Sequence, residues 1–177
     1  MAQPGEVLEH PRGDRLEFVA TSAATGGALL EMHVTYPPRT EAPAVHLHPE
    51  QRERFTIVQG ALVAVIGGVE GRYAAGETFE VAAGTPHTMH ADADEPTRFV
   101  WQVQPALRTE DFFEKVWDLA RANGSDAPRS PNVLQGALLM RSYGREFQLV
   151  RPPRWLQVPL FAVLAPLARL LGYRAVR

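Results

Sequence analysis

The sequence predicts a mainly β domain, a sandwich or a barrel, with helices appended at its C-terminal end. From Arg15 to about Gln104, short apolar runs alternate with polar residues and are bounded by turn residues, with no helical pattern between them. From Leu107 onward, apolar residues recur at helical spacing instead. The chain of 177 residues is 45% hydrophobic and 21% charged, values typical of a globular protein with a substantial core.

Individual strands are predicted from the alternation of apolar and polar residues. Two segments alternate most regularly, and the side chains expected on one face are Leu30, Met32, Val34 and Tyr36 in the first and Glu53, Phe55 and Ile57 in the second. Residues 61–68 are apolar on both faces and end in a Gly-Gly turn. Residues 76–87 predict a strand followed by a Gly-Thr-Pro corner, and a further strand ends at Pro105.

The chain divides into three expected parts. Residues 1–14 are expected to form a flexible N-terminal arm, residues 15–106 the β-barrel, and residues 107–177 a helical appendage that packs on the barrel or on a partner subunit. Within the appendage, a first helix begins near Thr109, which suits an N-cap, and a second is expected between 133 and 147. The polar residues 123–132 between them predict a linker.

Charge and composition exclude several function classes. The net charge is only −2, and no basic recognition helix is present, so nucleic acid is not an expected partner. Residues 1–120 carry −9 and residues 121–177 carry +7, an acidic body followed by a basic tail. The absence of cysteine excludes disulfides and thiolate chemistry. The polar N-terminus does not resemble a signal peptide, so a cytoplasmic location is expected.

The basic tail contains an apolar segment that is similar to a membrane span. It has 11 uncharged residues from Val158 to Ala168, whereas a span needs about 20. Pro159 and Pro166 also interrupt it. A helix that covers a hydrophobic surface or makes a dimer contact is therefore the favoured interpretation, and a helix lying in a membrane interface is the alternative.

Two histidines on alternate positions are candidate metal ligands. His46 and His48 project from one face of a predicted strand, with Leu47 on the other face. Residues 49–51 can turn the chain. If the strand that begins at Glu53 pairs back across this turn, its carboxylate lies beside the two imidazoles. Two neutral imidazoles and a carboxylate suit one divalent transition metal ion, namely Fe, Mn, Co, Ni or Zn.

A firm site needs a fourth ligand, and His87 is the candidate because it follows a Gly-Thr-Pro corner that can turn the chain inward. Gly60 is expected to end the hairpin that carries the other three ligands.

Both segments resemble the paired motifs of the cupin superfamily. The first motif, G-x5-H-x-H-x3,4-E-x6-G, is matched by His46, His48, Glu53 and Gly60, and the second, G-x5-P-x-G-x2-H-x3-N, by Gly76, Gly84 and His87. Thr40, Ala82 and Ala91 depart from the motifs, at positions that are not metal ligands. The resemblance covers residues from about 30 to 105. It implies a small single-domain, RmlC-like jelly-roll barrel that holds a metal ion with three histidines and one glutamate, and a homodimer.

Three functions remain open from the sequence. The first is a metal-dependent enzyme acting on a small organic molecule, most plausibly an oxygenase (a dioxygenase) or a related enolate-type reaction, with Glu53 as the catalytic candidate. The second is an O2-independent cyclase, isomerase or lyase that uses the same ligands. The third is a non-catalytic sensor or ligand-binding protein.

The substrate is expected to be apolar or aromatic, because the predicted inward-facing side chains are of that kind. The candidate substrate-binding residues are Phe55, Ile57, Leu62, Met89, Trp101 and Val103. No cluster of basic residues points into the predicted strands to hold a phosphate group.

Overall fold

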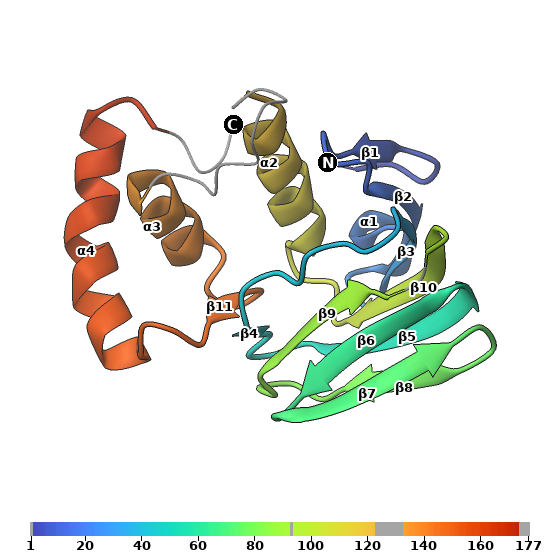
Figure 1. Ribbon diagram of the computed structural model, residues 1–177. Helices are drawn as coiled ribbons and strands as arrows, with labels where there is room; N and C mark the ends of the chain where they lie inside the picture. Colours follow the sequence, from blue (N-terminus) through green and yellow to red (C-terminus); the bar gives the residue numbers. More distant parts are fainter. Residues whose placement is uncertain (1, 93, 123–132, 174–177) are drawn as a thin grey trace.

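In the computed structural model, which describes residues 2–92, 94–122 and 133–173, the strands form two antiparallel sheets. The larger sheet has the order β1-β2-β3-β10-β5-β8, and the smaller has the order β11-β4-β9-β6-β7. Figure 1 shows the two sheets together on one side of the molecule and the longer helices on the other. This arrangement confirms the predicted jelly-roll fold with appended C-terminal helices.

The larger sheet contains most of the regularly alternating segments. Its strands are β1 (Val7–Glu9), β2 (Arg15–Ala20), β3 (Leu30–Tyr36), β5 (Arg52–Gln59), β8 (Thr78–Val81) and β10 (Thr97–Gln104). The short helix α1 (Ser22–Thr25) lies between β2 and β3. In β3 and β5 the predicted inward positions are buried or partly buried, and most of the intervening ones are more exposed, as the period of two requires.

The smaller sheet contains the histidines. Its strands are β4 (His46–Leu47), β6 (Ala61–Ile66), β7 (Val69–Ala74), β9 (His87–Ala91) and β11 (Gln148–Leu149). β6 and β7 form the expected hairpin, and Gly67 and Gly68 both adopt the positive φ that its tight turn requires. β11 was not predicted. It comes from the C-terminal part of the chain and pairs with β4.

The predicted hairpin between the histidine strand and the glutamate strand is wrong. β4 pairs with β9 and β11, whereas β5 pairs with β10 and β8 in the other sheet. Residues 49–51 therefore carry the chain from one sheet to the other. Gly60 likewise does not end that hairpin but connects β5 to β6 across the two sheets. Strands β4 and β5 therefore lie in opposite sheets, and their side chains meet across the interior of the β domain instead of the strands pairing through hydrogen bonds.

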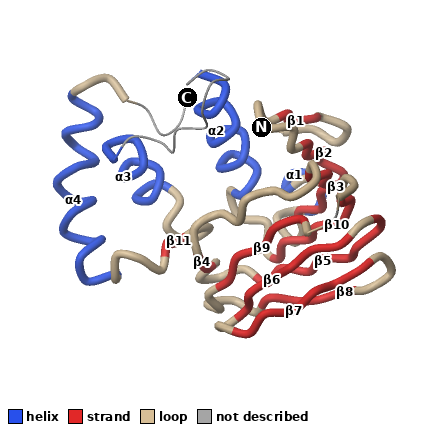
Figure 2. The backbone as a smooth tube through the Cα atoms, viewed as in Figure 1, coloured by secondary structure: helices blue, strands red, loops and turns tan. Residues whose placement is uncertain are grey.

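Helix α1 was not predicted, but the three longer helices occur where helical spacing predicted them. They are α2 (Thr109–Ala122), α3 (Val133–Ser142) and α4 (Arg154–Leu170). Phe112, Phe113 and Leu119 of α2 and Leu139 of α3 join the same buried cluster as the strands, so these two helices pack on the β domain. Figure 2 shows α4 beyond α3, on the side away from the strands. The linker expected at 123–132 lies outside the described residues.

The N-terminal residues differ from the flexible arm that was expected. Strand β1 pairs with β2, and Leu8 and Ala2 are buried in the main core. The alternation in this segment covers only a few residues, which is too short for a period of two to be recognised. Within the part of the chain that the structure describes, the helices are all too short or too polar to cross a membrane.

Substituting Gly60 with alanine is expected to destabilise the fold, because two costs add. Its φ is +75°, and an added Cβ would lie 2.6 Å from Thr97 Oγ1 and 3.0 Å from the Thr97 Cα. Gly76→Ala is the matched control, since its φ is +89° but nothing lies within 4 Å of the added atom. We expect Gly60→Ala to lower the free energy of unfolding by about 2–3 kcal/mol and Gly76→Ala by about 1 kcal/mol. Denaturant unfolding of both variants measures the difference. Equal losses would show that contact with Thr97 contributes nothing.

Candidate metal centre

Three imidazoles meet inside the β domain. His46 on β4 and His87 on β9 are directly opposite in the antiparallel register, and their ring centroids are 4.4 Å apart. His48 lies two residues beyond His46 and therefore on the same face. Its ring centroid is 5.2 Å from that of His46 and 5.3 Å from that of His87. All three side chains are buried. One ring nitrogen from each lies within 4.8 Å of the others, a grouping that could hold a metal ion.

Glu53 reaches this cluster from the opposite sheet. Its Oε1 lies 3.3 Å from His48 Nε2, and its Oε2 lies 2.9 Å from His87 Nε2. The indole Nε1–H of Trp101, on the neighbouring strand β10, donates a hydrogen bond of 3.0 Å to Oε1. The carboxylate is only 1% exposed, so its charge needs compensation by the groups around it.

Backbone carbonyls determine the tautomer of each imidazole. The Nδ1–H of His46 donates to Ala44 O at 2.9 Å, that of His48 to Glu146 O at 2.5 Å, and that of His87 to Thr85 O at 3.0 Å. A carbonyl oxygen can only accept, so Nδ1 carries the hydrogen in every case. Each neutral ring then presents the lone pair of Nε2, which is the arrangement found in histidines that ligate metals.

The inward-facing atoms lack partners. His48 Nε2, His87 Nε2 and Glu53 Oε2 are fully buried and have no hydrogen-bond partner among the described residues. A carboxylate oxygen facing an imidazole lone pair is repulsive unless a cation or a proton lies between them. A divalent ion would satisfy all three atoms at once, so the donor set fits the metal that the sequence predicted.

Burial and mutual charge affect the pKa values of these groups. Burial, followed by the neighbouring His87 and His48, lowers the pKa of His46 to about 4, so this ring is neutral at physiological pH. Burial opposes ionisation of Glu53, but His48 and His87 outweigh it and lower the pKa of Glu53. Burial likewise opposes protonation of His87, but the adjacent Glu53 carboxylate raises the pKa of His87. The cluster therefore combines a neutral ring with an ionised carboxylate.

The C-terminal segment contributes contacts that sequence reasoning missed. Besides accepting from His48, Glu146 has a buried carboxylate that accepts a hydrogen bond from the backbone N–H of Arg108. Phe147 stacks on His46, with ring centroids 4.6 Å apart and planes 22° from parallel. Only long-range contacts bring residues 146–147 to the histidines, so no local pattern could have identified them.

A cavity of about 450 Å³ opens in front of the histidines. His46 and His48 lie in its wall, and its other apolar and aromatic lining residues are Tyr36, Met89, Trp101, Phe112, Phe113, Val116, Trp117 and Phe147. Polar side chains, among them Arg12, Asp14 and Arg39, also line it. The helix α2 thus supplies much of the wall of a cavity whose metal-binding groups come from the strands.

The predicted substrate-binding residues fall into two groups. Met89 and Trp101 line the cavity. Phe55, Ile57, Leu62 and Val103 are instead almost completely buried in the core and are not among its lining residues. Alternation identifies which face of a strand points inward, but it cannot distinguish a packed interior from an open one.

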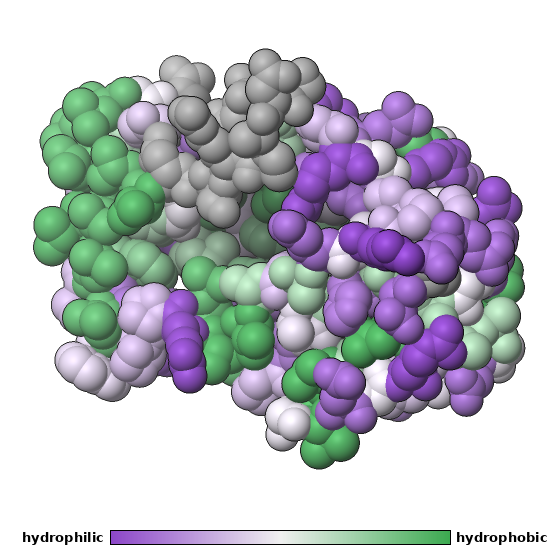
Figure 3. Space-filling model, viewed as in Figure 1, coloured by the Kyte–Doolittle hydropathy of each residue, from purple (hydrophilic) through white to green (hydrophobic). Residues whose placement is uncertain are grey.

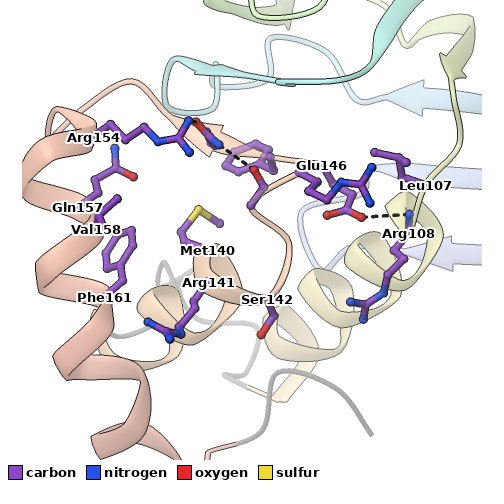
Figure 4. A pocket seen from close by; sticks show the side chains of 14 residues that line it. Leu107, Arg108, Met140, Arg141, Ser142, Glu146, Arg154, Gln157, Val158 and Phe161 are labelled. Atoms are coloured by element: carbon purple, nitrogen blue, oxygen red, sulfur yellow. Dashed lines mark hydrogen bonds between the residues drawn. The ribbon is translucent and has the colours of Figure 1, made fainter.

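A second cavity, of about 610 Å³, lies between α4 and the chain that follows α3. Figure 4 shows Val158 and Phe161 of α4 on one side of it, with Met140 and Arg141 of α3 beside them. The dashed line at Glu146 marks its bond with the backbone N–H of Arg108, and Glu146 lines both cavities.

The comparisons with known proteins identify the β domain. The cupin domain family matches residues 32–103. The match shows that these residues are similar to a cupin domain, and it covers less than half of the chain. The matched range agrees with the extent of the motif resemblance, and it includes His46, His48, Glu53 and His87.

Solved cupin structures have the same fold. An RmlC-like cupin from Shewanella frigidimarina is 15% identical, with a TM-score of 0.52 over 62% of this chain and 92% of that one. A predicted oxalate decarboxylase from Thermotoga maritima is 18% identical, with a TM-score of 0.50 over 56% of this chain and 90% of that one. No curated protein matches the sequence.

Two departures from the cupin motifs contact each other. Thr40 stands where the first motif has glycine, and Ala91 where the second has asparagine. The Oγ1 of Thr40 accepts a hydrogen bond of 2.8 Å from the backbone N–H of Ala91. The loop before β4 is therefore attached to β9 by a side chain that the motif glycine could not supply.

Removing one imidazole is expected to abolish tight metal binding. We expect the wild-type chain to bind about one transition metal ion, and His87→Ala to weaken that binding by more than about 100-fold, because losing a ligand exceeds the 10–100-fold effect of losing its outer partners. His90→Ala is the matched control, since His90 lies on the same strand but is not part of the cluster. Metal analysis after dialysis against competing chelators measures the affinities. Failure of the wild type to take up any transition metal would contradict the site.

The indole N–H of Trp101 is expected to position the Glu53 carboxylate. Trp101→Phe keeps an aromatic wall but removes this donor, so we expect metal affinity to fall by about 10-fold or more. Trp117→Phe is the control, because Trp117 lines the same cavity and its buried Nε1 has no hydrogen-bond partner. Competition titrations with a metallochromic chelator provide the measurement. An unchanged affinity in Trp101→Phe would show that this hydrogen bond does not orient the carboxylate.

Proposed function

We propose that this protein is a metal-dependent enzyme that acts on a small apolar or aromatic organic molecule, with a dioxygenase or a related enolate-type reaction as the expected class. The observation that carries the proposal is the set of buried Nε2 and Oε2 atoms, without hydrogen-bond partners among the described residues, beside a cavity lined in part by aromatic side chains. A purely structural cluster would satisfy these atoms internally, because unpartnered buried polar groups destabilise a fold.

The proposed ligands are His46, His48, His87 and Glu53. A divalent ion held by them would supply Lewis acidity and a site where a substrate oxygen or O2 binds. The chain's own contribution is to hold three rings in one tautomer through the carbonyls of Ala44, Glu146 and Thr85. Fixed rings need no reorganisation when the reaction begins.

Glu53 has a second proposed role, as the catalytic base. Its Oε1 accepts from Trp101, while its Oε2 has no hydrogen-bond partner. The two oxygens are therefore unequal: Oε1 is held by the indole, and Oε2 is buried against His87 as a proposed ligand. Glu53 would receive a substrate proton only by shifting away from the ion toward the cavity. Without an ion, and despite its burial, protons on the rings of His48 and His87 lower the pKa of Glu53, and a bound cation would likewise keep the carboxylate ionised.

The walls of the cavity favour a substrate with an apolar ring. Trp101 packs edge-to-face on Phe113, with centroids 5.2 Å apart, and Phe112 stacks on Phe147 at 5.1 Å. These rings leave a cavity of about 450 Å³, within the range of small-molecule sites. Aromatic walls also exclude water, which strengthens electrostatic interactions with the bound substrate.

The test is turnover of a panel of small phenols, catechols and enolisable ketones by the full chain loaded with Fe(II), Mn(II), Ni(II), Co(II) or Zn(II). We expect product only in air, and Glu53→Gln to lower turnover by about 100-fold or more. His90→Ala is expected to retain wild-type turnover. Mass spectrometry of the products and an oxygen electrode provide the measurements.

The same experiment separates the proposal from its alternatives. Turnover that is unchanged without O2 would replace the oxygenase with a cyclase, isomerase or lyase. Saturable binding of panel members with no turnover under any metal would indicate a sensor.

A further inference from the structure

The outer surface of α4 is apolar and uncovered. The residues that α4 buries fall on one stripe, where Ala165 and Ala168 pack with Leu138 of α3. Apart from Val158, which lines the cavity on the inner side, the large apolar side chains of α4 and its C-cap that remain exposed are Trp155, Leu156, Leu160, Val163, Leu167, Leu170 and Leu171. Figure 3 shows hydrophobic residues gathered along the side of the molecule that Figure 1 assigns to α4. An exposed apolar surface of this extent indicates an interaction site.

Positive charge borders this surface at both ends. Arg151 and Arg154 lie at the start of α4 and Arg169 near its end, all exposed. Residues 147–177 contain five arginines and no acidic residue. Arg154 itself is turned toward the cavity on the inner side of the helix, where it donates to Gln148 and where Arg141 also lies, so Arg151 and Arg169 carry the charge at the two ends of the surface. The partner of α4 must therefore combine an apolar interior with negative charge at its edge.

We propose that α4 docks the protein on the surface of an anionic lipid bilayer, lying parallel to it. The exposed aliphatic side chains and Trp155 would enter the boundary between headgroups and acyl chains, while the arginines contact anionic headgroups. We expect the axis of α4 to lie parallel to the bilayer surface for two reasons. One side of the helix packs against α3, which leaves the other side exposed, and arginines lie at both ends of the helix rather than at one end.

The distribution of charge favours a membrane over a second copy of this chain. If α4 paired with α4 of another copy, parallel or antiparallel, two basic segments would come together, and residues 147–177 contain no acidic side chain to neutralise them. The acidic residues instead belong to the body, where residues 1–120 carry −9. Figure 1 places α4 on the side away from the strands, so the acidic body would face away from an anionic bilayer.

Vesicle flotation of the full chain tests the proposal. The probes are vesicles of phosphatidylcholine alone and of phosphatidylcholine with 30% phosphatidylglycerol. We expect partitioning onto the anionic vesicles to be at least about tenfold stronger, and to weaken but persist as salt is raised, because apolar and ionic contacts both contribute. Equal recovery in the unbound fraction with and without vesicles would overturn the proposal.

Matched variants separate α4 from the rest of the surface. Val163 on α4 is 69% exposed, and Val69 on β7 is 73% exposed. We expect Val163→Glu to lower partitioning by at least about tenfold, since it removes an apolar contact and adds a like charge to the headgroups, and Val69→Glu to leave it unchanged. Equal partitioning of the two variants would overturn the proposal, with circular dichroism verifying that both remain folded.

Oligomeric state supplies the remaining outcome. Light scattering without lipid would show whether the wild type forms a dimer that Val163→Glu dissociates. Such a dimer, together with no preference for anionic vesicles, would assign the surface to a second copy and overturn the lipid assignment. The lipid assignment is supported if the wild type floats with anionic vesicles and if its molar mass in solution is the same as that of Val163→Glu.

Discussion

The burial of the Glu53 carboxylate among three imidazoles is the constraint on which the rest of this structure depends. Removing an ionised carboxylate from water costs several kcal/mol unless it is compensated. Here one oxygen accepts from Trp101, and the other faces His87 at 2.9 Å without a hydrogen bond. Because the carbonyls of Ala44, Glu146 and Thr85 orient the rings, the cluster presents lone pairs inward and is organised around a cation.

That constraint gives the C-terminal segment a role in the site. β11 pairs with β4, Glu146 O accepts from His48, and Phe147 stacks on His46. Strand β4, which carries His46 and is followed directly by His48, is only two residues long, so it has little hydrogen bonding of its own to hold it in place. The segment after α3 therefore completes the histidine site, while α4, which follows it, keeps an apolar surface exposed.

Local patterns predicted the elements well, because burial of one face of a strand leaves a period of two in the sequence. The inward positions of β3 and β5, the Gly-Gly hairpin and the ends of β10 and α2 all follow from such patterns. Those local patterns did not predict which strands pair with one another. Adjacent strands β4 and β5 look like a hairpin in the sequence, yet each is hydrogen-bonded to strands far away in the chain.

The sequence by itself indicated the fold class through its period of two and placed His46 and His48 on one face, while the turn residues and the motif resemblance added Glu53 and His87 as candidate ligands. The tertiary structure alone decided that Glu53 approaches from the opposite sheet, and that Glu146, Phe147 and α2 complete the site. The physical reason is that these contacts join residues up to 98 positions apart. Contacts over such distances are selected by packing of the whole chain, which no local periodicity records.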